Sequence, residues 1–195
     1  MVFLSFVAFF VALVAGLLVV RHARRHARRY ARAAKPQRFH VGHTPRIGGV
    51  ALFAGCAFGW AAGVAALYAG NRGLLNVTPA MALGWTVALL PALVGGIAED
   101  LSQRMAVGNR MALTALSAGL AVWLLDVTLA RTGIDWLDTL IAMPGAGAAM
   151  ALAVLAVAGL PHAFNIIDGY NGLSGMVALV VCLALVFPTA AELSM

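Results

Sequence analysis

Charged residues are scarce in this chain: they make up 10% of its 195 residues, whereas 63% are hydrophobic. A soluble globular domain carries about 25% charged residues, so this composition cannot supply a surface solvated by water. Cysteine is scarce too. Cys56 and Cys182 both lie within apolar runs, and we interpret them as buried thiols rather than a disulfide. No tripeptide period occurs, which excludes a collagen-like fold, and the high apolar content excludes a disordered one. The chain is therefore predicted to be a polytopic membrane protein.

Six apolar runs reach or approach the length of a membrane span, which is about 20 residues. They lie at Met1–Val20, Ile47–Gly70, within Leu74–Ala98, at Met111–Leu125, within Thr139–Leu160 and at Leu173–Phe187. We expect an all-α bundle of about six transmembrane helices that forms one membrane domain over residues 1–195.

Positive charge is concentrated in residues 21–46, which hold nine of the 13 Lys and Arg residues. Because basic residues favour the cytoplasmic side, we predict that this segment is cytoplasmic and that the amino terminus lies outside. The same topology makes Glu99–Arg110 and Pro161–Gly172 cytoplasmic, so that 11 of the 13 basic residues face one side. A basic cluster directly after a span favours anionic lipid headgroups as its partner, and we predict no nucleic-acid partner.

Small residues recur at helical spacing in two places. The basic segment has no Gly or Pro until Pro36 and repeats Ala, which predicts that the first helix continues into it. In the second run Gly55, Gly59 and Gly63 recur every four residues, a ridge that lets another helix approach closely. A Gly- and Ala-rich composition produces this spacing by chance about equally well, so both interpretations stay open.

The topology places three unusual segments on the cytoplasmic side, and the first is His40–Gly49. Gly48 and Gly49 begin a predicted helix, where backbone N–H groups without side-chain obstruction can meet an anion. Arg46 adds a donor fork suited to phosphate. Taken by itself, a basic helix start that serves topology alone is the favoured explanation of this segment.

The second segment carries Glu99 and Asp100 at the cytoplasmic end of the third run. Adjacent acids at a helix C-terminus are unfavourable against the helix dipole. We therefore expect a compensating partner, which is a cation, Arg104 or Arg110. An ordinary solvated helix end is the alternative.

In the third segment Asn165, Asp168 and Asn171 recur every three residues between two apolar runs. Carboxylate and amide oxygens are ligands for a hard cation, and the amide groups can also pair with the edge of a nucleobase. A plain interhelical turn is the alternative, but the density of polar groups beside the membrane disfavours it.

Together, HTPRIGGVALF, GGIAEDLSQR and PHAFNIIDGYNGLSG resemble successive motifs of the polyprenyl-phosphate sugar-1-phosphate transferase family. This family includes the undecaprenyl-phosphate N-acetylglucosamine-1-phosphate transferases and the phospho-N-acetylmuramoyl-pentapeptide transferase. The resemblance follows the family's order, covers nearly the whole chain and is most specific in the third motif. It implies transfer of a sugar-1-phosphate from a UDP-linked N-acetylated sugar to a polyprenyl phosphate, with UMP released and Mg²⁺ as cofactor. The expected location is the cytoplasmic face of the bacterial inner membrane.

The resemblance also implies roles for the third segment. Asn165 matches the family's metal-binding asparagine. Asp168 matches the aspartate of its Asn-x-x-Asp-Gly motif, which lies near the nucleotide and diphosphate. Asn171 stands where some members have aspartate, and its implied task is contact with uracil.

Glu99 and Asp100 align with the family's paired acids near the reaction centre, which are commonly Asp-Asp. Glu at position 99 suggests a branch that serves O-antigen or a related lipid-linked glycan. Whether Asp100 acts as a general base, orients the nucleophile or helps to hold the metal stays open. Arg46, Gly48 and Gly49 are the expected substrate-binding residues of the first motif.

The family pattern continues with a Gly-Asp-x-Gly-Ser-like segment and a His-rich cytoplasmic loop, and neither occurs in these 195 residues. We therefore expect the chain to correspond to the amino-terminal portion of the family fold. None of His22, His26, His40, His43 and His162 replaces that loop on sequence grounds. An enzyme and a non-catalytic membrane subunit or remnant are the two leading hypotheses, with an unrelated transporter a weaker third, and homo-oligomerisation stays open.

Overall fold

The computed structural model describes the backbone of residues 2–30, 47–70, 77–102, 104–129, 131–143, 147–167 and 173–192. It describes the side chains of 3–22, 47–70, 77–102, 104–129, 131–143, 147–164 and 173–184. These parts of the chain contain helices and no strand. The helices are α1 (Val2–Tyr30), α2 (Gly48–Tyr68), α3 (Pro79–Ser102), α4 (Val107–Leu125), α5 (Asp135–Ile141), α6 (Gly147–Ile167) and α7 (Leu173–Glu192).

Within the described residues, each apolar run that was expected to span the membrane contains a helix. Within the described residues, α1, α2, α3 and α6 are long and apolar enough to cross a bilayer, while α7 contributes the shorter apolar stretch Leu173–Ala184. α4 occupies the fourth run. The expectation of an all-α membrane helix bundle is confirmed. The first helix continues through the basic stretch to Tyr30, as its sequence predicts.

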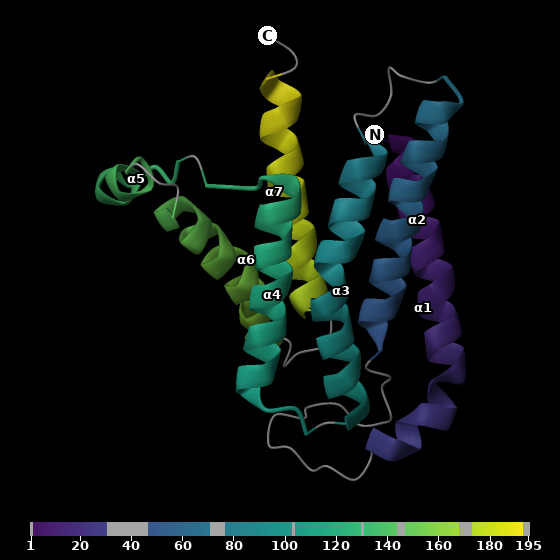
Figure 1. The fold of residues 1–195 in the computed structure, drawn as a ribbon. Coiled ribbons are helices and arrows are strands. Elements are labelled where there is room, and N and C mark those ends of the chain that lie inside the picture. Colours follow the sequence, from purple (N-terminus) through teal and green to yellow (C-terminus); the bar gives the residue numbers. More distant parts are fainter. Residues whose placement is uncertain are drawn as a thin grey trace.

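The helices pack mainly as neighbours in the sequence (Figure 1): α1 lies against α2, α2 against α3, and α3 against α4, while α6 packs on α4. We call the end of the bundle at which α1 reaches Tyr30 the basic end. α2 begins there at Gly48, α3 ends there at Ser102, and α4 begins there at Val107 (Figure 1). α6 runs toward this end and α7 away from it. The bundle therefore gathers the ends of the helices that carry the three motifs.

Large side chains point out of the bundle and small ones point in. The described core consists mainly of alanine, and no large side chain in it is fully buried. By contrast Phe3, Phe6, Phe9 and Phe10 on α1 are each more than half exposed. Between helices in lipid there is no hydrophobic driving force, so close packing depends on small residues at the interface. This arrangement is the one expected of a protein that lipid surrounds.

The glycine ridge of α2 is a packing surface for α1. A Cβ added to Gly55 would lie 2.6 Å from the Ala8 carbonyl oxygen and 2.8 Å from the Ala12 Cβ. At Gly59 it would lie 3.1 Å from the Ala8 Cβ, and at Gly63 it would lie 3.2 Å from a methyl group of Leu4. Chance composition therefore does not explain the four-residue spacing, because each glycine faces α1.

α3 and α4 approach each other in the same way, and a buried serine joins them. A Cβ on Gly95 would lie 2.9 Å from a methyl group of Leu113. Ser117 is buried on α4, and its hydroxyl accepts a hydrogen bond from the backbone N–H of Ala92 at 2.9 Å. Ala92 follows Pro91 inside α3. A proline within a helix disturbs the backbone hydrogen bonds of its turn, and neighbouring side chains can satisfy the groups that it releases.

The prediction of buried cysteines is wrong. Cys56 on α2 and Cys182 on α7 are free thiols on exposed faces of their helices. In a soluble protein an apolar thiol is stabilised by burial, but on a membrane span an outward face contacts lipid instead of water. Their apolar neighbours in the sequence therefore did not distinguish an inward from an outward position.

The predicted boundaries of the fifth span also need correction. Thr139 belongs to the short helix α5, and the spanning helix α6 begins at Gly147. α6 then continues through Pro161 to Ile167, although the fifth run was expected to lie within Thr139–Leu160. Proline is tolerated in membrane helices because neighbouring groups satisfy the backbone atoms that it leaves unpaired. As a consequence Asn165 lies on a helix.

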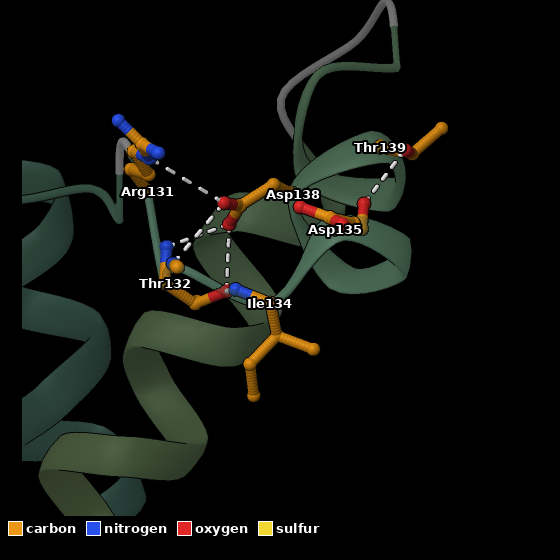
Figure 2. A network of polar contacts seen from close by, with 7 residues as sticks. Arg131, Thr132, Ile134, Asp135, Asp138 and Thr139 are labelled. Carbon is orange, nitrogen blue, oxygen red and sulfur yellow. Dashed lines mark hydrogen bonds and ion pairs between the residues drawn. The ribbon is translucent and has the colours of Figure 1, made fainter.

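At the end of the bundle opposite the basic end, Asp138 of α5 organises the turn before its own helix (Figure 2). The N–H and hydroxyl of Thr132 both donate to Asp138 Oδ1 at 2.6 Å, and the Gly133 N–H donates to Oδ2 at 3.1 Å. Arg131 Nε lies 3.7 Å from Oδ2. The Thr132 hydroxyl above all, with the two backbone donors, lowers the pKa of Asp138 from its ordinary value.

Candidate functional site

Two adjacent acids near the end of α3 face different neighbours. Glu99 and Asp100 are both partly buried. Because a helix turns about 100° per residue, consecutive side chains cannot share one direction. Glu99 faces the start of α4: its Oε1 lies 3.6 Å from Arg110 Nη1, and its Oε2 accepts a hydrogen bond from the Met105 N–H at 3.1 Å. Asp100 instead lines a groove between α2 and α3.

The ion pair identifies the compensating partner that the two acids were expected to require. Arg110 is this partner, since it pairs with Glu99. Arg104 is exposed, and its backbone N–H donates a hydrogen bond to the Ser102 hydroxyl. Arg110 stands in the first turns of α4, and its Nε is buried without an acceptor among the described residues. The guanidinium thereby offsets the unfavourable contact between Glu99 and the C-terminal dipole of α3.

Apart from Asp100, the residues that line the groove between α2 and α3 are apolar. The groove has a volume of about 280 Å³, and Asp100 and Gly49 both border it. The carboxylate stands two residues before the end of α3, so it lies near the basic end of the bundle. The remaining lining residues are Ile47, Val50, Leu52, Phe53, Cys56, Leu89, Ala92, Leu93, Gly96 and Ile97.

The first motif contributes the beginning of α2. Gly48 and Gly49 are its first two residues, both are exposed, and a Cβ on either would meet no described atom within 4 Å. Ile47, which precedes the helix, makes no side-chain capping bond. The first backbone N–H groups of a helix have no partner within it, and an anion could accept hydrogen bonds from them. Arg46 lies outside the described residues.

The third motif is described only in part. Asn165 lies on α6, two residues before the helix ends at Ile167, and its side chain is not among the described ones. Asp168 and Asn171 lie outside the described residues. The sequence-based roles of these three residues therefore stay predictions.

Thr114 and His162 form a contact that the sequence did not predict. The Thr114 Oγ1 of α4 lies 3.1 Å from the His162 Nε2 of α6. Thr114 stands one turn after Arg110, and His162 stands three residues before Asn165. One feature of the sequence could have singled out His162: it stands three residues from a predicted metal ligand, and residues at this spacing share a helix face.

The oxygen donors of the motifs suit a hard cation, although the described residues do not form a complete cation site. Among them, no three His, Cys, Asp or Glu side chains gather to hold a metal. Mg²⁺ is usually bound by one or two carboxylates together with substrate phosphates rather than by a cage of protein ligands. Asp100 and the predicted ligand Asn165 have the right donor chemistry, whereas Arg110 engages Glu99.

Comparison with known proteins places the second and third motifs in one family. The sequence model of glycosyl transferase family 4 matches residues 82–194, which is more than half of the chain. The matched segment contains Glu99, Asp100, Asn165, Asp168 and Asn171, whereas the first motif precedes it. No curated protein and no solved structure matches the chain.

Proposed function

This chain belongs to glycosyl transferase family 4 and forms a membrane helix bundle, and from that premise we propose its reaction. The family implies a transferase of glycosyl phosphates. In the proposed reaction an oxygen of a polyprenyl phosphate attacks the sugar-bearing phosphorus of a UDP-linked N-acetylated sugar. A new phosphorus–oxygen bond forms, the bond to the uridine-bearing phosphate breaks, and UMP leaves. The product is a polyprenyl-diphospho-sugar for a cell-envelope glycan such as O-antigen.

The observation that carries this proposal is the position of Asp100 beside an apolar groove near the basic end. The acceptor is anchored in lipid and the nucleotide sugar is dissolved in water, so the reaction requires a polar group where the two phases meet. Asp100 lies in the segment that matches the family. The basic end faces the cytoplasm under the proposed topology, and its charge favours anionic lipids there.

Phosphoryl transfer depends mainly on positioning and on reducing the repulsion between anions. A phosphate monoester has a second pKa of about 6, so most of the acceptor phosphate is already a dianion at neutral pH. Proton removal is therefore a small part of the task, and we assign to Asp100 the orientation of the reacting groups. Glu99 holds Arg110 in place at 3.6 Å.

The remaining roles follow the motifs. Asn165 would hold Mg²⁺, which when bound neutralises charge on the diphosphate. Asp168 would lie near the nucleotide and the diphosphate. Asn171 would contact uracil through its amide.

Arg46 and the N-terminal backbone groups of Gly48 and Gly49 would receive a substrate phosphate. The opening around the two glycines supports this assignment, because no side chain that the structure describes crowds the first turn of α2.

The test is an assay of the purified chain in liposomes with UDP-N-acetylglucosamine, undecaprenyl phosphate and Mg²⁺, in which UMP and the lipid-linked sugar are both measured. We expect equal amounts of the two products and loss of both when EDTA removes the metal. Failure to form either product with a panel of UDP-sugars, from a chain that remains folded, would instead support a non-catalytic membrane subunit.

A further inference from the structure

His162 makes its polar contact to another helix at a position that the proposed reaction does not explain. Its Nε2 lies 3.1 Å from Thr114 Oγ1, and the two residues are 48 positions apart in the sequence. Both side chains are partly buried. A histidine within a membrane bundle is costly unless it is paired. The contact with Thr114 provides that pairing.

The surroundings of the threonine hydroxyl indicate which atom carries the proton. Thr114 Oγ1 lies 3.1 Å from the Arg110 carbonyl oxygen and 3.0 Å from the Met111 carbonyl oxygen. Carbonyl oxygens only accept hydrogen bonds, and a hydroxyl has one hydrogen to donate. When the Thr114 hydroxyl donates to a carbonyl group of its own helix, its oxygen is left as the acceptor and His162 Nε2 is the donor to Thr114 Oγ1. If the hydroxyl donated to the ring instead, two carbonyl oxygens would face its lone pairs with no hydrogen between them.

This contact completes a connection across three helices. Glu99 of α3 pairs with Arg110 of α4, and the Arg110 carbonyl accepts from Thr114, whose oxygen accepts from His162 of α6. Residue 165 lies one turn beyond His162 on the same helix. The chain of contacts therefore links this turn of α6, through α4, to the pair of acids on α3.

We propose that His162, with its proton on Nε2, is a positioning residue that holds the Asn165 turn of α6 in register with Glu99 and Asp100. The inference rests on the proposed function, because it gives the residue a purpose in that reaction. Misplacement of a reacting group by about 1 Å can reduce turnover about 100-fold. Loss of the contact should therefore affect kcat more than substrate binding.

The test uses two amide replacements that differ in reach. The side-chain nitrogen of glutamine can occupy the place of Nε2, whereas that of asparagine reaches only as far as Nδ1. We expect His162→Gln to keep kcat within about threefold of the wild type, and His162→Asn to lower kcat about tenfold or more with KM for the UDP-sugar nearly unchanged. Equal kcat values for the two variants, or a change in KM alone, would overturn the proposal.

A spectroscopic measurement tests the contact independently of turnover. In a chain with His22, His26, His40 and His43 replaced by Gln, ¹⁵N NMR of His162 at a pH where the ring is neutral should show the proton on Nε2. Thr114→Ser should preserve this signature, and Thr114→Val should alter it. A proton on Nδ1, or a spectrum that is the same in both Thr114 variants, overturns the proposal. A wild-type chain without turnover but with the Nε2–H signature would contradict the proposed function and leave the contact established.

Discussion

Arg110 at the start of α4 binds Glu99 near the end of α3, with Nη1 and Oε1 3.6 Å apart. This pair closes the turn between the two helices, and the Met105 N–H inside the turn donates to the same carboxylate. Asp100, one residue further, faces the groove between α2 and α3. The adjacent acids therefore have different surroundings. The structure supports a positional role for Glu99 and leaves Asp100 as the acid that borders the groove.

Neutral replacements at both ends of the ion pair should reveal its contribution to stability. Glu99→Gln leaves Arg110 without its partner, and Arg110→Gln leaves the acid against the helix dipole. Because both side chains are partly exposed, we expect each single variant to lower the free energy of unfolding by about 1 kcal/mol. The double variant should lose less than the sum of the two, with a coupling of about 0.5 kcal/mol. Unfolding by denaturant in detergent micelles measures this free energy for the wild type, the two single variants and the double variant. Strictly additive losses would contradict the pairing.

Asp100→Asn should remove transferase activity while the fold survives. The amide is nearly the same size as the carboxylate, but it carries no charge to orient the reacting groups or to hold a metal. We expect a loss of about 100-fold or more in kcat in the liposome assay. Asp126→Asn is the matched control, since Asp126 is exposed at the end of α4 in a left-handed conformation that asparagine tolerates. Activity that persists in Asp100→Asn, or an equal loss in the control, would remove Asp100 from the mechanism.

Composition and local spacing predicted most of the helices. The apolar runs became helices because such segments in a membrane must satisfy their backbone groups internally. The continuation of α1 to Tyr30 followed from the lack of Gly and Pro before Pro36. The placement of Glu99 at a helix C-terminus predicted a compensating partner and left a cation, Arg104 and Arg110 as candidates, and the structure identifies Arg110.

Contacts between helices were less accessible to prediction. The sequence did not indicate that Thr114 and His162 meet, because their pairing depends on how α4 and α6 are placed. The exposure of Cys56 depended on which face of α2 turned outward, and both faces are apolar. The expected end of the fifth run at Leu160 fell short of the end of α6, because proline ends helices in water more strongly than in a membrane.

Gly55→Ala should weaken the packing of α1 on α2. The added Cβ would lie 2.6 Å from a backbone oxygen and 2.8 Å from the Ala12 Cβ, so the helices must separate. We expect a loss of about 1–3 kcal/mol in the free energy of unfolding. Gly119→Ala is the matched control, because an added Cβ there meets no atom of the described residues within 4 Å. It should be neutral or slightly stabilising, since alanine is the better helix former. Equal effects at the two positions would show that the ridge does not determine the packing.

The turn held by Asp138 should lose its order only in acid. Hydrogen bonds from Thr132 and Gly133 lower the pKa of Asp138. Because the pKa is lower in the folded turn, the carboxylate contributes fully to the stability of the turn at any pH above about 3.9, the pKa of aspartate in an unfolded chain. That contribution disappears as the pH falls through the still lower value of the folded turn. Fluorescence of Trp136 on α5, with Trp60, Trp85 and Trp123 replaced by Phe, should stay constant from pH 7 to about pH 4 and change below that.

Asp138→Asn should give the altered fluorescence already at pH 7, whereas Asp135→Asn on the same helix should show the same pH dependence as the parent. A parent-like signal from Asp138→Asn across this range would contradict the role of the carboxylate.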